Sequence, residues 1–263
     1  MNQIARQATA LFDPSRPYTF HIELTDKCNA ACPMCPRTDA LDFCRPNTDV
    51  IAKVDLTLAD FQRHFPSSLA TRTAKVVFSG AYGDPLAAHW CVEVVEHLAT
   101  YGVEIAISTN GSLRTPAYFE RLARAMQSCN GKLELHVDGL ADTNPLYRVN
   151  TDFSKIMENA RAYIAAGGNA EWHFIVFRHN EHQIEEALQL SRETGFSRFV
   201  LIDSSRFDNS GQFPYRLPNG ERRVLEKPTR NLDELHSMIG ADDEHDPTLM
   251  LDPDGAIRCK YSM

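Results

Sequence analysis

The sequence predicts an α/β protein, namely a partial (β/α)6 barrel with a short C-terminal extension. Six short strand-like segments alternate with segments whose apolar residues recur at helical spacing. Such alternation is typical of a parallel sheet with helices packed on its outer face. Six units are fewer than the eight of a closed barrel, so we expect an open one, with the chemistry at the carboxyl ends of its strands.

The predicted strands are residues 19–25, 75–79, 103–109, 132–138, 171–177 and 198–202. Side chains alternate across a strand, so polar residues an even number of positions apart share a face. Three strands carry such faces, formed by His21, Glu23 and Thr25, by Glu104 and Ser108, and by Glu134, His136 and Asp138. Because parallel strands are usually covered outside, we expect a wet, ligand-binding interior; solvent exposure at a barrel rim is the alternative.

The predicted helices are residues 57–66, 88–101, 115–130, 153–167 and 180–194. Thr57 with Asp60, and Asn180 with Gln183, have the three-residue spacing of a capping box. Gly102 is placed to end the second of these helices. These signals divide the chain into short, regularly spaced units.

The composition suits one sizeable domain with a small appendage, at 263 residues and 43% hydrophobic content. We divide the chain into an N-terminal extension (1–16), a core (17–205) and a C-terminal extension (206–263). The net charge of −8 argues against a nucleic-acid partner. No apolar run is long enough to span a bilayer, so no membrane partner is expected. Residues 1–16 lack the apolar core of a secretory signal.

The chain has seven cysteines, an odd number that makes a poor disulfide framework. Three crowd into one loop, and the others are scattered at Cys44, Cys91, Cys129 and Cys259. This usage suits a reducing compartment, so we expect a cytoplasmic protein.

Cys28, Cys32 and Cys35 follow the first predicted strand at a C-x3-C-x2-C spacing. Thiolates this close in sequence can converge on one metal centre. A closed zinc site has four ligands, and a standard iron–sulfur cluster has one cysteine per iron. Three cysteines therefore leave one metal position open for an exogenous ligand. The spacing alone also allows three ordinary buried cysteines, or half of a zinc site.

In its barrel context this cysteine loop resembles that of the radical S-adenosylmethionine (radical SAM) superfamily, whose core is a partial TIM-like barrel. Three further segments resemble family motifs at successive strand ends. Residues 79–86 (Ser-Gly-Ala-Tyr-Gly-Asp-Pro-Leu) look like the "GGE"-type loop, residues 108–111 like the third strand end, and residues 136–139 like the fourth. The resemblance covers roughly residues 17–205 and is specific, because four motifs fall at four successive strand ends.

The resemblance implies a [4Fe-4S] cluster held by Cys28, Cys32 and Cys35. Its remaining iron would be chelated by the amino and carboxylate groups of S-adenosyl-L-methionine. One electron, from a donor such as flavodoxin or ferredoxin, would then break the sulfur–C5′ bond. The resulting 5′-deoxyadenosyl radical takes hydrogen from a peptide or small-molecule substrate. The resemblance does not define the reaction subclass.

The same resemblance assigns cofactor-binding roles to other residues. Met34 stands where the family usually has an aromatic and would pack against adenine. Gly80 and Gly83 would let the backbone approach the methionine moiety. Asp84, where the family often has glutamate, would accept from its ammonium. Arg148 would pair with its carboxylate; a surface arginine is the alternative.

Ser108, Asn110 and Asp138 are expected near the ribose hydroxyls. An ordinary turn is a second explanation of the Asn-Gly pair that begins at Asn110, and both can hold at once. Tyr82 and His136 are expected on the substrate side as the catalytic candidates, with Tyr82 also beside the cofactor. Simple packing is the alternative for the tyrosine.

Residues 252–255 (Asp-Pro-Asp-Gly) followed by Cys259 resemble the start of the SPASM or twitch extensions, which bind auxiliary iron–sulfur clusters. Either the sequence stops inside such an extension, with Cys259 as an auxiliary ligand, or there is no auxiliary cluster. Two other functions remain open. One is an iron–sulfur carrier or electron-transfer protein without SAM turnover. The glycine loop and the polar strand ends argue against it, because a cluster carrier does not need them. The other is a zinc-binding barrel.

Overall fold

A computed structural model describes residues 17–42, 55–80, 82–217, 219–231 and 233–235, and the backbone of 45–46, 249–251 and 257–259. Its central feature is one sheet with the strand order β12-β11-β1-β4-β5-β6-β7-β8. Six of its strands form a consecutive parallel run: β1 (Tyr18–Ile22), β4 (Thr73–Phe78), β5 (Glu104–Thr109), β6 (Lys132–His136), β7 (Asn169–Ile175) and β8 (Arg198–Ile202).

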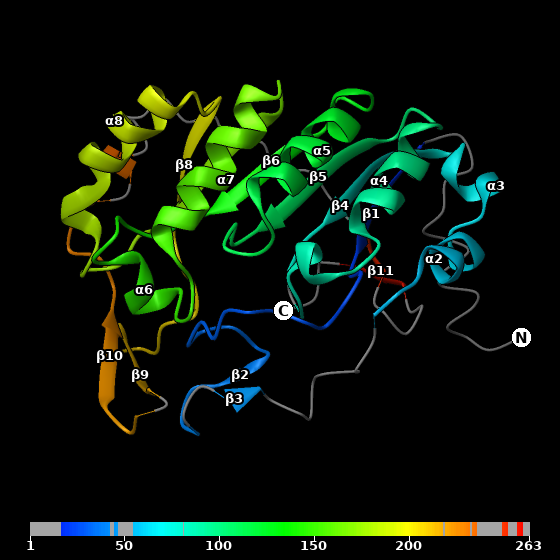
Figure 1. Ribbon diagram of the computed structural model, residues 1–263. Helices are drawn as coiled ribbons and strands as arrows, with labels where there is room; N and C mark the ends of the chain where they lie inside the picture. The colour runs from blue at the N-terminus through cyan, green and yellow to red at the C-terminus, as the bar shows by residue number, and fades with distance from the viewer. Residues whose placement is uncertain are drawn as a thin grey trace, which may run out of the picture.

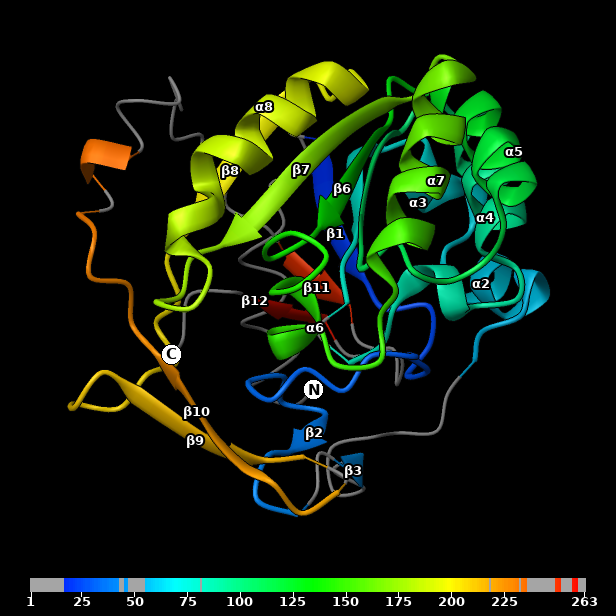
Figure 2. The ribbon, with the colours of Figure 1, turned by 60° about the vertical axis from the view of Figure 1, so that its left-hand side comes forward.

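These six strands correspond to the six predicted segments, and the partial barrel is confirmed. Within the described residues the sheet does not close on itself, because β8 and β12 are its two edges. The sheet curves so that its strands surround an interior that is open on one side (Figures 1 and 2). The carboxyl ends of the parallel strands therefore meet at one rim.

Helices cover the outer face of the curved sheet (Figure 1). They are α2 (Leu58–His64), α3 (Ser67–Ala70), α4 (Cys91–Ala99), α5 (Pro116–Gln127), α7 (Phe153–Ala165) and α8 (Ile184–Thr194). The short helix α6 (Asn144–Tyr147) lies instead beside the cysteine loop, and the 3-10 turns are η1 (Pro85–Ala87) and η2 (Glu181–Gln183). The apolar stripes of α4, α5 and α7 are buried in one hydrophobic core with the sheet. Within the described residues, we find no helix with the length and apolar character needed to cross a membrane.

The two faces of β6 have opposite characters. Leu133 and Leu135 are completely buried in the core that the helices cover. Lys132, Glu134 and His136, on the other phase, are only partly buried and face the interior. The predicted polar interior is therefore confirmed for this strand, because apolar side chains take the helix side and polar ones the open side.

One capping-box prediction is confirmed and the other is wrong. Thr57 accepts from the backbone N–H of Asp60, whose carboxylate accepts from the backbone of Thr57 in turn. The side chain of Asn180 makes no such cap. It is buried and bonds instead to the backbone of Phe177, Asp138 and Ile175, because strand ends packed beside it supply partners.

The C-terminal part contributes two further pairs of strands. β9 (Gln212–Arg216) and β10 (Arg222–Glu226) form an antiparallel hairpin apart from the main sheet. β11 (Leu249–Leu251) runs parallel to β1, and β12 (Ile257–Cys259) pairs with β11. A small pair, β2 (Thr38–Asp39) with β3 (Arg45–Pro46), follows the cysteine loop. The Cys259 side chain lies outside the described residues, and so does its expected ligand role.

Trp172 of β7 is a fully buried side chain of the core. Its ring packs at 5.4 Å from Phe196 and 5.8 Å from Phe199, between ring centroids. Its indole Nε1 donates to the carbonyl of Val137 at 2.8 Å. That carbonyl lies just after β6, so the tryptophan fixes the end of a strand that leads into the rim.

We predict that Trp172→Phe lowers the free energy of unfolding by about 2–4 kcal/mol, because it leaves a cavity and a buried carbonyl without its donor. The matched control is Trp90→Phe, whose side chain is 38% exposed. The control should change stability by about 0.5 kcal/mol or less. Urea denaturation followed by circular dichroism measures both, and equal unfolding midpoints would contradict this account of the core.

Candidate active site

The cysteine loop is fastened to the rim by backbone hydrogen bonds. Ala31 N donates to Val149 O at 2.9 Å, which ties the loop to the segment after β6. Asp84 N donates to Lys27 O at 2.8 Å, which ties it to the glycine loop after β4. The loop that carries the three thiols is therefore held from two sides before any ligand binds.

Two thiols of this loop, those of Cys28 and Cys32, are poor acids in the metal-free protein. Burial raises the pKa of Cys28 to about 12, and the nearby carboxylate of Asp84 adds to the effect. Burial also raises the pKa of Cys32 to about 11, although the guanidinium of Arg148 opposes the shift. Such sulfurs become thiolates only with a strong compensating positive charge, which is what a metal centre supplies.

The spacing of the three sulfurs distinguishes between metal centres. Two thiolates on one zinc ion lie about 4 Å apart, because each Zn–S bond is about 2.3 Å long. The three sulfurs of this loop do not all lie within 4.8 Å of one another; in the described part of the chain, that criterion is met by another group of side chains. The three sulfurs are therefore not gathered around a single ion position, and this spacing is compatible with a larger cluster.

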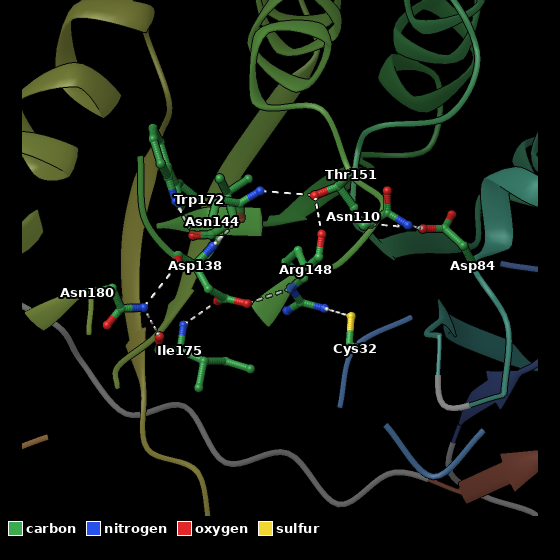
Figure 3. Close-up of polar contacts among 11 residues, drawn as sticks. Cys32, Asp84, Asn110, Asp138, Asn144, Arg148, Thr151, Trp172, Ile175 and Asn180 are labelled. Carbon is green, nitrogen blue, oxygen red and sulfur yellow. Dashed lines mark hydrogen bonds and ion pairs between the residues drawn. The ribbon is translucent and has the colours of Figure 1, made fainter. Parts of the chain in front are cut away.

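The carboxylate of Asp84 joins the glycine loop to the end of β5 by hydrogen bonds. It accepts from Leu86 N at 2.9 Å, from the Thr109 hydroxyl at 2.9 Å, and from Asn110 N and Nδ2 at 2.9 and 2.7 Å. Asn110 Nδ2 also donates to Asn29 Oδ1 at 2.9 Å. The Asp84–Asn110 contact, seen in Figure 3, thus links two strand ends to the cysteine loop.

Arg148 connects the end of β6 to Cys32 of the cysteine loop. Its Nε donates to Asp138 Oδ2 at 2.5 Å, and its Nη1 lies 3.8 Å from Cys32 Sγ (Figure 3). The arginine side chain is 14% exposed and that of Asp138 is fully buried. The surface alternative for Arg148 is therefore wrong, because this guanidinium is part of a buried ion pair.

Buried amides hold Asp138 in place. Asn144 Oδ1 accepts from Asp138 N at 2.9 Å, and Asn180 Nδ2 donates to Asp138 O at 3.0 Å. Asp138 Oδ1 in turn accepts from Ile175 N at 2.6 Å. Figure 3 shows these side chains converging between β6 and β7. Sequence reasoning missed Asn144 and gave Asn180 a helix-capping role instead. The position of each residue after a strand was the one available signal.

The remaining predicted cofactor residues lie at the rim. Met34 is buried, and its carbonyl accepts from Arg206 Nη1 at 2.6 Å. A Cβ added to Gly83 would lie 2.1 Å from Thr25 O, so only glycine lets this loop press against the end of β1. A Cβ on Gly80 would meet Gly83 O at 2.7 Å. Both glycines are thus required by the loop itself, whichever ligand it binds.

The predicted substrate-side residues come from different elements. The backbone of Tyr82, in the glycine loop, accepts from Arg37 Nε at 3.0 Å. His136 lies on β6 with its ring 5.1 Å from that of His173. Burial, with smaller contributions from His173 and Arg148, holds the pKa of His136 well below its ordinary value, so the imidazole is neutral. Ser108 donates to Glu134 at 2.5 Å, inside the barrel, and is not paired with Asn110.

The β9–β10 hairpin covers the cysteine loop. Tyr215 and Leu225 of the hairpin belong to a small hydrophobic cluster that also contains Cys32 and Met34. Tyr215 donates its hydroxyl to Leu146 O at 2.9 Å. Figure 2 shows the hairpin beside β2 and α6, below the main sheet. This cover limits the access of water to the thiols.

Comparisons with known proteins agree with this geometry. The family model described as the radical SAM superfamily matches residues 22–191. The AdoMet-dependent heme synthase of Methanosarcina barkeri (strain Fusaro / DSM 804) is 25% identical over 195 residues, covering 72% of this chain and 52% of that protein.

Solved structures share the fold. Streptococcus suis SuiB superposes with a TM-score of 0.60 at 17% identity, over 90% of this chain and 49% of that one. The structure of anSMEcpe with bound AdoMet has a TM-score of 0.64 at 15% identity, over 92% of this chain and 73% of that one. The chain thus spans about half the length of the heme synthase and of SuiB.

We predict that Arg148→Met destabilises the protein by about 3–5 kcal/mol, because it leaves the Asp138 carboxylate buried without its partner. Adding Asp138→Asn should restore part of the loss, since the charge is then gone. Arg121→Met is the matched control: its exposed pairs with Glu93 and Glu96 should contribute at most about 1 kcal/mol. Urea denaturation of the metal-free protein tests this, and equal losses for Arg148→Met and Arg121→Met would refute the buried pair.

Proposed function

We propose, from the premise that this chain belongs to the radical SAM superfamily, that it cleaves S-adenosyl-L-methionine reductively to abstract hydrogen from a substrate. The observation that carries the proposal is the loop of three cysteines after β1, with Cys32 buried and Cys28 and Cys35 partly buried, within a ring of polar strand ends. Members of this family use a [4Fe-4S] cluster together with SAM. When bound, these groups supply the reducing electron and the radical that attacks the substrate.

Within this proposal Cys28, Cys32 and Cys35 hold the cluster. The three thiols fit it because their loop is fastened to the rim and because the thiols of Cys28 and Cys32 need further positive charge to ionise. Arg148 Nη1 donates toward Cys32 Sγ, and its guanidinium would be the partner for the carboxylate of SAM. These side chains bind and orient; the bond-breaking chemistry belongs to the cofactors.

The roles proposed for Asp84 and Asp138 are positioning rather than direct ligation. Both carboxylates are buried, and both oxygens of each already accept hydrogen bonds or an ion pair from the chain. Asp84 keeps Asn110 against the cysteine loop, and Asp138 keeps Arg148 there. Arg148, Asn110, Ser108, Met34 and the glycine loop remain the candidates for contact with SAM itself.

The substrate we propose is a peptide. Support comes from the solved relatives, since SuiB has been crystallised with its precursor peptide SuiA and anSMEcpe with a peptide. A small molecule is the alternative, as in the structural relative methylornithine synthase. We further propose flavodoxin or ferredoxin as the electron donor, and the cytoplasm as the compartment, because the thiols and the cluster require reducing conditions.

The direct test is anaerobic reconstitution with iron and sulfide, followed by dithionite and SAM. We expect 5′-deoxyadenosine and methionine in equal amounts. A cluster-loaded protein that produces no 5′-deoxyadenosine would instead be an iron–sulfur carrier. Zinc without iron or sulfide would identify a zinc protein.

Cys32→Ala should abolish the visible absorption of the reconstituted cluster while leaving the far-ultraviolet circular dichroism unchanged. The reason is that a cube held by two thiolates on this loop lacks a protein ligand for one iron. The matched control is Cys129→Ala, which removes a buried thiol elsewhere in the core and should retain the cluster spectrum. A spectrum that survives Cys32→Ala would show that the ligand assignment is wrong.

A further inference from the structure

A second cluster of metal-ligating side chains lies inside the barrel, separate from the cysteine loop. It consists of Glu134, His136 and His173, each of which offers a ligand atom within 4.8 Å of the others. We propose that this triad binds a divalent metal ion of the borderline class, such as Zn²⁺, Fe²⁺ or Co²⁺. Two imidazoles and one carboxylate are a ligand set that suits these ions.

The strand register places the triad on rigid elements. β6 and β7 pair in parallel with His136 beside His173 and Glu134 beside Glu171. Glu134 and His136 are two residues apart on β6, so both project from the same face. Sites built on strands keep their geometry better than sites on loops. The three ligands are thus brought together by the sheet itself.

Neighbouring side chains orient two of the three ligands. Ser108 donates its hydroxyl to Glu134 Oε2 at 2.5 Å from the adjacent strand β5. His173 Nε2 lies 3.0 Å from Glu171 Oε2. When Nε2 of this ring donates to the carboxylate, Nδ1 keeps the lone pair that a metal needs. A carboxylate behind a histidine is the usual support of a metal-bound imidazole.

The charges beside the triad leave room for a cation. Lys132 bridges Glu134 at 3.2 Å and Glu171 at 3.4 Å, and Arg198 lies 3.9 Å from Glu171. Glu171 is thus compensated by two positive side chains. The Glu134 carboxylate accepts from the Lys132 ammonium and from the Ser108 hydroxyl. Because a carboxylate has about four lone-pair sites, it can still coordinate an ion.

The position of the triad suggests what the ion would do. His136 lies two residues before Asp138, so the triad sits one layer deeper in the barrel than the Arg148–Asp138 pair at the rim. Three protein ligands leave at least one coordination position open. An ion here would present that position to the barrel interior, where an oxygen or nitrogen donor of a substrate, such as a carboxylate, can coordinate.

The experiment uses the full chain with Cys28, Cys32 and Cys35 all changed to alanine, so that the loop thiols cannot bind the probe. After dialysis against Zn²⁺, elemental analysis should find one zinc per chain. Co²⁺ in its place should give d–d absorption bands without sulfur-to-cobalt charge transfer. His136→Ala and His173→Gln in this background should lose the metal, whereas His64→Ala, which alters an exposed histidine on α2, should keep it.

Glu134→Gln separates loss of a metal ligand from loss of the fold. The amide oxygen can still accept from Ser108, but as a neutral group it is a poor metal ligand. This variant should remain folded by circular dichroism and bind zinc at least tenfold more weakly. Two results would overturn the proposal: no zinc bound above the level of buffer, or zinc binding unchanged by His136→Ala and His173→Gln. Both are independent of SAM cleavage, which is measured with the cysteines intact.

Discussion

The fixed loop that holds three thiols after one strand, with Cys32 buried and Cys28 and Cys35 partly buried, is the constraint on which the rest of this structure depends. Sulfurs in such surroundings resist ionisation, and the pKa values of Cys28 and Cys32 are raised accordingly. The loop is nevertheless fixed by backbone bonds to Val149 and from Asp84. A rigid loop whose thiols resist ionisation favours the binding of a cationic metal centre, because the centre supplies the positive charge that stabilises thiolates.

The polar groups around that loop work as two buried networks. In one, Asp84 gathers donors from the end of β5 and so holds Asn110 against Asn29. In the other, Asp138 holds Arg148 beside Cys32. Buried networks of this kind are costly when incomplete and rigidifying when complete. Their effect is to join strand ends that are far apart in sequence into one preorganised rim.

The sequence predicted what depends on local pattern. Alternating polarity located the six strands, and the Thr57–Asp60 spacing located the start of α2, because these signals lie within one element. Contacts that depend on how elements meet were not predictable. Asn180 has the spacing of a helix cap but bonds to strand ends, and His173 joins His136 only through the β6–β7 register. The roles given to the individual SAM-contacting residues remain predictions.

The most direct test of the central claim is pulsed electron–nuclear double resonance on the reduced, reconstituted protein with SAM labelled with ¹⁵N at its amino group. If the cysteine loop holds a cluster with one iron open to the cofactor, the labelled nitrogen must show a hyperfine coupling to the cluster spin. The coupling should be absent without SAM. A reduced cluster whose spectrum is unchanged by saturating SAM, with no nitrogen coupling, would contradict the account.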